Sequence, residues 1–171
     1  MRSRENRNKT GAKHENVVFA GGFAWVGLYG EDIDRAYPHE LFNIAELDEP
    51  DEITMRDFHR EFDAKNWTMM IAHIIGVDHA GHYYLNAGHS EIERKLVDEE
   101  KILKSIIDKL DRDTVMLVFG DHGMTDQGGH GGESEEELRT IFFAYSKGGL
   151  PMKRKSEKVR AIFDEMTIDL K

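Results

Sequence analysis

The 171-residue chain has no cysteine, and this absence excludes disulfide bonds and every metal site built on thiolate ligands. A zinc-like ion could be held only by imidazole nitrogens and carboxylate oxygens, the donors typical of hydrolytic and group-transfer centres. Basic residues are outnumbered, with 23 Lys and Arg against 33 Asp and Glu and a formal net charge of −10. This acidic excess argues against a nucleic-acid partner.

Long apolar segments are also absent from the sequence. The longest apolar run, residues 69–77, is interrupted by His73 and falls well short of the roughly 18–20 residues that a membrane-spanning helix needs. The arginines near the amino end are not followed by the apolar segment of a secretory signal. We therefore predict neither a signal peptide nor a transmembrane helix in this chain.

The order of apolar patterns predicts alternating strands and helices. Residues 1–15 are polar and are expected to be disordered, residues 32–50 are predicted to be irregular, and a single domain is expected to follow from residue 16. Such alternation predicts an α/β fold, a mainly parallel sheet flanked by helices on both faces. Within it, strands 67–77 and 114–119 are expected to be adjacent or nearly so. The predicted strands are 16–20, 67–77, 114–119 and 141–146, and the predicted helices are 51–65, 91–111 and 157–166.

Aspartate and histidine residues follow two of these strands directly. Asp78 and His82 come after the strand at 67–77, across a turn containing glycine, and Asp121 with His122 comes after the strand at 114–119. His130 lies in a glycine-rich segment a few residues later. Ligands gather at the carboxyl ends of parallel strands, so these side chains are expected at one edge of the sheet. Each pattern alone is weak, since turn aspartates and surface histidines are common, but together they favour a metal site.

The sequence motifs in these segments resemble those of a known family. The motifs in order are GVDHAGH (76–82), GDHGM (120–124) and HGG (130–132), and they are similar to the alkaline phosphatase superfamily. The longer stretches IAHIIGVDHAGH and LVFGDHGMTDQGGHGGESEEE resemble the GPI ethanolamine phosphate transferases, most of all type 3. The resemblance implies an alkaline phosphatase-like catalytic domain, of which residues 16–171 would be the carboxy-terminal part.

The resemblance also implies a site with two zinc ions. Asp78, His82 and His130 would bind one ion, and Asp121 and His122 would supply part of the second site. The remaining ligands and a threonine nucleophile are expected upstream of this chain, so no catalytic nucleophile is assigned within it. The chain is therefore expected to be a fragment, a truncated gene model or a decayed copy, and to be inactive alone.

The activity implied for the full-length protein is transfer of phosphoethanolamine from phosphatidylethanolamine to a mannose of the GPI glycolipid. Such a protein would lie in the endoplasmic reticulum membrane with this domain on the lumenal side, held through regions absent here and accompanied by a small membrane partner subunit. Alternatives are another metal-dependent phosphodiesterase or phosphatase of the superfamily, or a decayed metal-binding domain. One departure is visible: Gly22, Phe23 and Ala24 stand where the family carries two acids and a threonine.

Overall fold

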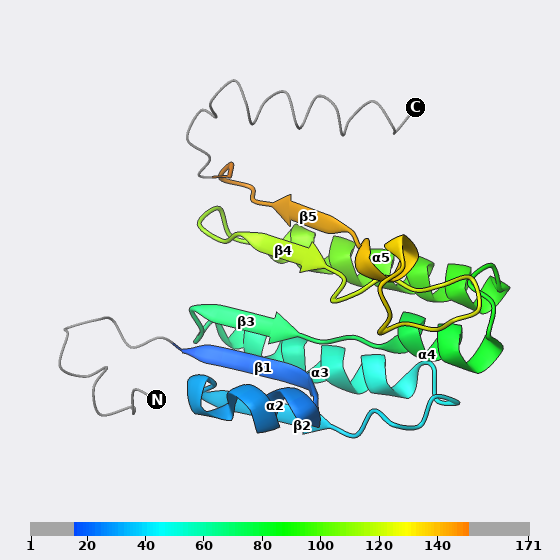
Figure 1. Cartoon of the computed structure of the whole chain (residues 1–171). Helices are drawn as coiled ribbons and strands as arrows, with labels where there is room; N and C mark the ends of the chain where they lie inside the picture. The colour runs from blue at the N-terminus through cyan, green and yellow to red at the C-terminus, as the bar shows by residue number, and fades with distance from the viewer. Residues whose placement is uncertain (1–15, 151–171) are drawn as a thin grey trace. The chain divides into compact units, whose positions relative to one another are not determined.

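The computed structural model describes residues 16–150, and these residues divide into two compact units. The first unit comprises residues 16–101 and 122–139, and the second comprises residues 102–121 and 140–150. The predicted helix at 157–166 and the amino-terminal segment 1–15 lie outside the described residues. Figure 1 shows the order of the elements along the chain.

The first unit is built on a three-stranded parallel sheet. Strand β1 (Val17–Gly22) is central and pairs with β2 (Arg35–His39) on one side and with β3 (Met69–Ala72) on the other. Three consecutive residues of β1 are each 1% exposed: Val18, Phe19 and Ala20. A continuous buried apolar run is what a parallel strand covered on both faces requires, and the sequence predicted this strand correctly.

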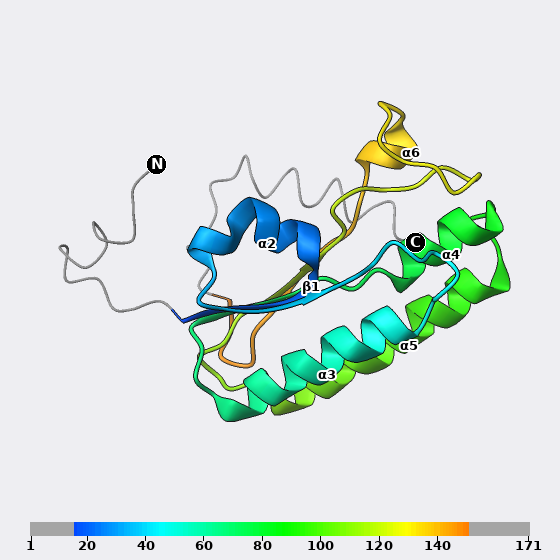
Figure 2. The ribbon, with the colours of Figure 1, turned by 90° about the horizontal axis from the view of Figure 1, so that it is seen from below.

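Helices cover both faces of that sheet. Helix α2 (Phe23–Tyr29) and helix α3 (Glu49–Ala64) lie on opposite sides of β1, as Figure 2 shows. The short 3-10 turn η1 (Gly30–Asp32) follows α2. Met55, Phe58 and Phe62 form the buried face of α3, as their helical spacing predicts. The predicted fold class, a parallel sheet flanked by helices, is therefore confirmed.

The second unit contains a separate sheet. The long helix α5 (Ser90–Lys109) begins in the first unit and ends in the second, and it is followed by β4 (Met116–Phe119) and later by β5 (Phe142–Tyr145). Strands β4 and β5 pair in antiparallel register. Only the four-residue helix α6 (Glu135–Leu138) lies between them, and parallel pairing usually needs a longer helical crossover.

Three details of the predicted sheet are wrong. Strands β3 and β4 belong to different sheets, so the expected adjacency of 67–77 and 114–119 does not hold. The predicted strand at 67–77 forms a ladder only at Met69–Ala72. Residues 32–50 include β2, which carries Pro38 opposite Gly21. Proline is tolerated there because β2 is at the edge of the sheet, where no second neighbour needs its missing N–H.

No helix within residues 16–150 combines the length and the apolar composition that crossing a bilayer demands.

Candidate metal centre

The helix α4 (Gly76–Tyr84) carries Asp78 and His82. Residues four apart lie on the same face of a helix, and here Asp78 Oδ1 is 3.5 Å from His82 Nε2. The sequence predicted a glycine-containing turn at this place, and that prediction is wrong. Gly81 is accommodated inside the helix, and the convergence of the two side chains follows from helical geometry.

The start of α4 is fixed by a side chain from another helix. The first amides of a helix have no partner within it, and Asp51 of α3 accepts hydrogen bonds from the Ile75 and Gly76 amides at 2.8 and 3.1 Å. Lys95 of α5 places its Nζ 2.6 Å from Asp51 Oδ2, and the two side chains are 4% and 5% exposed. A buried carboxylate is therefore paired with both a cation and the helix start.

Gly76 is required by this arrangement. A Cβ at this position would lie 2.0 Å from Lys95 Cε and 2.2 Å from Asp51 Oδ2. Any side chain would therefore push the buried ion pair apart or displace the helix start. We call Asp51, Lys95 and Gly76 the helix anchor.

His130 reaches α4 on a loop that is packed against that helix. Gly128 has a φ of +75°, and a Cβ there would lie 2.1 Å from the Gly81 carbonyl oxygen, so the two backbones touch. The Ala87 amide also donates to the Asp126 carbonyl at 2.9 Å. Glycine is needed at 128 both for the positive φ and for the close approach.

Residues after His130 are held by a capping box. The Ser134 hydroxyl accepts from the Glu137 amide, while the Glu137 carboxylate accepts from the Ser134 amide at 3.2 Å and from the Gly132 amide at 2.8 Å. The Ser134 hydroxyl also donates to the Glu137 carboxylate at 2.6 Å. This hydrogen bond, followed by those from the Gly132 and Ser134 amides, lowers the pKa of Glu137. We call Gly132, Ser134 and Glu137 the loop anchor.

Three donor atoms meet at one point of this unit. Asp78 Oδ1, His82 Nε2 and His130 Nε2 are separated by 3.5, 3.2 and 2.9 Å. In a tetrahedral zinc site with bonds of about 2.0–2.2 Å, neighbouring ligand atoms are about 3.3–3.6 Å apart. Asp78 Oδ1 is also buried and accepts no hydrogen bond among the described residues. The spacing and the nitrogen and oxygen donors of these three residues therefore suit a metal ion.

His122 belongs to the same cluster. Its ring stacks on His130 with centroids 3.7 Å apart, and one ligand atom each from Asp78, His122 and His130 lies within 4.8 Å of the other two. His122 Nδ1 is 2.9 Å from the Gly123 carbonyl oxygen, so Nδ1–H donates and Nε2 is left as the acceptor. Asp121 belongs to the second unit, so the predicted half-site of Asp121 and His122 stays a prediction.

Of the residues that position the candidate ligands, Asp51 could not be recognised from the sequence, whereas the pair Ser134 and Glu137 could. Asp51 is 24 residues from the amide of Ile75 that it caps, and no local pattern reveals such a contact. The Ser-x-x-Glu spacing of Ser134 and Glu137 is a capping-box signature that could have been found. The candidate ligands are therefore recognisable from the sequence, whereas most of the residues that hold them in place are not.

The chain is similar to known proteins. Residues 9–142 match the family described as type I phosphodiesterase / nucleotide pyrophosphatase. The chain is 36% identical over 130 residues to human GPI ethanolamine phosphate transferase 3, catalytic subunit, covering 76% of this chain and 12% of that protein. It is 35% identical over 136 residues to GPI ethanolamine phosphate transferase 3 of Saccharomyces cerevisiae, covering 78% of this chain and 13% of that protein. It is 32% identical over 136 residues to GPI ethanolamine phosphate transferase 2 of Kluyveromyces lactis, covering 78% of this chain and 17% of that protein.

Proposed function

Since the chain belongs to the type I phosphodiesterase / nucleotide pyrophosphatase family, we propose that it is part of a zinc-dependent phosphoethanolamine transferase of GPI anchor biosynthesis. The observation that carries this proposal is the convergence of Asp78, His82 and His130 in a chain whose relatives are named GPI ethanolamine phosphate transferases. The chain spans only 12% to 17% of the length of those relatives. The activity proposed is therefore that of a longer protein.

Asp78, His82 and His130 would hold the first zinc ion, and Asp121 and His122 would contribute to a second. Bound zinc supplies positive charge that stabilises phosphoryl oxygens during group transfer. Asp78 brings the carboxylate that offsets this charge, while the two imidazoles bind as neutral ligands. The helix anchor orients Asp78 and His82 through α4, and the loop anchor supports the segment that carries His130.

The substrates proposed follow from the relatives' names and the resemblance of the motifs. The donor would be phosphatidylethanolamine and the acceptor a mannose of the GPI glycolipid precursor. We place the longer protein in the endoplasmic reticulum membrane with this domain in the lumen, beside a small membrane partner subunit. We propose no nucleic-acid partner, because the whole chain has a formal net charge of −10.

Zinc titration tests the ligand assignment directly. After chelator treatment, calorimetry of the chain should show close to one tight zinc equivalent, because three protein ligands meet at the first site. His82→Ala should weaken this binding about 100-fold or more, and His122→Ala much less. Two equally tight equivalents, or tight binding that survives His82→Ala, would show that the ligands are divided wrongly.

A chimera tests the activity. Residues 16–139 would replace the matching segment of GPI ethanolamine phosphate transferase 3 in yeast cells that lack their own copy. Labelled ethanolamine should then enter the GPI precursor, and the His82→Ala chimera, expressed at the same level, should fail to incorporate it. Incorporation by the His82→Ala chimera would contradict the role of this centre in transfer.

A phosphodiesterase of soluble esters is the alternative that the family description favours. A chimera that hydrolyses a soluble aryl phosphodiester, but leaves the GPI precursor unlabelled, would establish it. Zinc binding with neither activity would instead indicate a decayed domain.

A further inference from the structure

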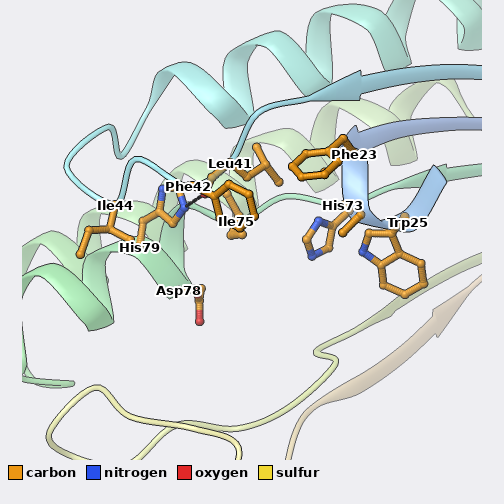
Figure 3. A pocket seen from close by; sticks show the side chains of 11 residues that line it. Phe23, Trp25, Leu41, Phe42, Ile44, His73, Ile75, Asp78 and His79 are labelled. Atoms are coloured by element: carbon orange, nitrogen blue, oxygen red, sulfur yellow. Dashed lines mark hydrogen bonds between the residues drawn. The ribbon is translucent and has the colours of Figure 1, made fainter. Parts of the chain in front are cut away.

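A pocket opens beside the candidate metal centre in the first unit. Its volume is about 290 Å³, near the lower limit of the roughly 300–1,000 Å³ that is usual for ligand sites. Asp78, a proposed zinc ligand, lies at one edge, as Figure 3 shows. The pocket and the candidate metal centre therefore share Asp78.

The walls of this pocket are mostly apolar. The side chains that line it from α2, from the segment after β2 and from the segment after β3 include Phe23, Trp25, Leu41, Phe42, Ile44 and Ile75. His79 also contributes to the wall, but its two ring nitrogens contact the backbone carbonyls of Glu46 and Leu41 at 3.0 and 2.8 Å. Its polar atoms are therefore already engaged. His73 also lines the pocket, with its ring centroid 5.7 Å from that of Trp25. Apart from His73 and Asp78, the surface left for a ligand is predominantly hydrocarbon.

A cationic head group does not suit these walls. Asp78 is the only acidic side chain among the described residues that line the pocket, and it is committed to the metal centre. Phe23 and Phe42 pack edge to face, with ring centroids 5.5 Å apart and an interplanar angle of 77°. One ring face is thus covered by the other ring's edge and is not open to an ammonium.

The apolar surface continues from the pocket to the outside. Phe23, Phe42 and Ile44 line the pocket and are still 44%, 76% and 41% exposed. A compact ring would fill the pocket and leave this rim in water, whereas a hydrocarbon chain would fill the pocket and cover the rim as well. The pocket and its exposed apolar rim together favour a hydrocarbon chain over a compact ring as the ligand.

Resting on the proposed function, we propose that this pocket binds an acyl chain of the phospholipid donor near its glycerol, with the donor phosphate directed toward Asp78. The donor's diacylglycerol portion is thereby recognised on this side of the centre, and its amine is recognised elsewhere. Phe23 and Phe42 are specificity-determining residues in this arrangement.

Binding can be measured without metal and without turnover. The chain has two tryptophans: Trp25 lines the pocket, whereas Trp67 stacks on Phe62 away from it. In a Trp67→Phe background, with chelator present, dihexanoyl phosphatidylethanolamine below its micelle concentration should change the Trp25 fluorescence saturably. Glycerophosphoethanolamine, which has the same head group without acyl chains, should produce no saturable change.

Matched variants locate the binding. Phe23→Asp should weaken lipid binding at least tenfold. Leu28→Asp introduces the same charge on the same helix, at a residue that is 74% exposed and does not line the pocket, and it should change the affinity less than twofold. Equal effects of the two variants, equal binding of the head group alone, or tighter binding of an aryl phosphodiester than of the lipid would each overturn the proposal.

The outcome is separable from the proposed function. Saturable, Phe23-dependent lipid binding together with a chimera that fails to label the GPI precursor would support the pocket and reject the transferase. Labelling of the GPI precursor by the chimera, without lipid binding by the chain, would support the transferase and reject the lipid pocket.

Discussion

The two halves of the candidate centre are held in contrasting ways. Asp78 and His82, the helix half, lie on α4, whose start is fixed by a buried ion pair. His122 and His130, the loop half, lie on a glycine-rich segment supported by hydrogen bonds at the surface around Glu137. A disturbance of the helix anchor reaches the core between α3 and α5, whereas a disturbance of the loop anchor stays local.

This difference suggests a division of labour in ligand binding. Ligands on a helix with a buried anchor are preorganised, so little ordering is needed when a metal binds. Ligands on a loop can adjust their position as the metal and substrate enter. Substitutions at or near either anchor test this difference, and their expected effects on stability differ in size.

The largest effect is expected at Gly76. Gly76→Ala places a Cβ 2.0 Å from Lys95 Cε, which separates a buried ion pair, a change that typically costs about 3–5 kcal/mol. Urea unfolding followed by circular dichroism would measure the loss. The matched control is Gly27→Ala in α2, where nothing lies within 4 Å of the added Cβ and about 0.5–1 kcal/mol of stabilisation is expected. Similar effects of the two substitutions would refute the helix anchor.

The next effect concerns pH, and carboxyl groups near the two anchors give it opposite signs. Burial, with a contribution from the charge on Asp51, raises the pKa of Glu99 on α5 from 4.5 to about 7. Because the folded state holds this proton more tightly than the unfolded state, the stabilisation is complete below pH 4.5 and is lost as the pH rises through about 7. The loss is about 3 kcal/mol at most. The lowered pKa of Glu137 predicts the opposite trend for the loop anchor, which weakens as the pH falls through that lowered value.

Glu99→Gln tests this by removing the titration while it keeps a neutral side chain. The free energy of unfolding, measured by urea titration at a series of pH values, should become flatter between pH 4.5 and about 7. Glu93→Gln, at an exposed position of the same helix, makes the same charge change and should leave the slope intact. A slope unaltered by Glu99→Gln would mean that this carboxyl does not control it.

The smallest effect is expected at Ser134. Ser134→Ala removes the capping hydroxyl that accepts from the Glu137 amide, a loss of about 1 kcal/mol. Amide hydrogen exchange should be about fivefold faster at Gly132 and Glu137, with the urea midpoint of the whole chain nearly unchanged. A shift of that midpoint as large as the one caused by Gly76→Ala would contradict the local character of the loop anchor.

Sequence reasoning succeeds where the physical cause is local. The apolar run of β1 and the spacing of Met55, Phe58 and Phe62 on α3 specify their own structures. The meeting of Asp78, His82 and His130 was also predictable, since strand ends and glycine-rich loops share one edge of an α/β sheet. Their role as zinc ligands stays a prediction.

The failures have long-range causes. Helix α4 was missed because its cap comes from Asp51, 24 residues away, and not from a residue beside it. The pairing of β4 with β5 depends on which strands lie within reach after folding, which hydrophobic periodicity does not encode. A lysine on a helix is usually exposed to solvent, yet Lys95 is buried because its ammonium pairs with the Asp51 carboxylate of α3.

The helix anchor has a further consequence for the order of folding. Three segments of the chain contribute to it: α3 supplies Asp51, α4 supplies Gly76 and α5 supplies Lys95. Closing such loops costs chain entropy before any contact is gained, so the helix anchor is complete only when α3 and α5 have both docked. During synthesis, the helix that carries Asp78 and His82 leaves the ribosome before the lysine that completes its anchor, so we expect these candidate ligands to be held in place only after α5 has emerged.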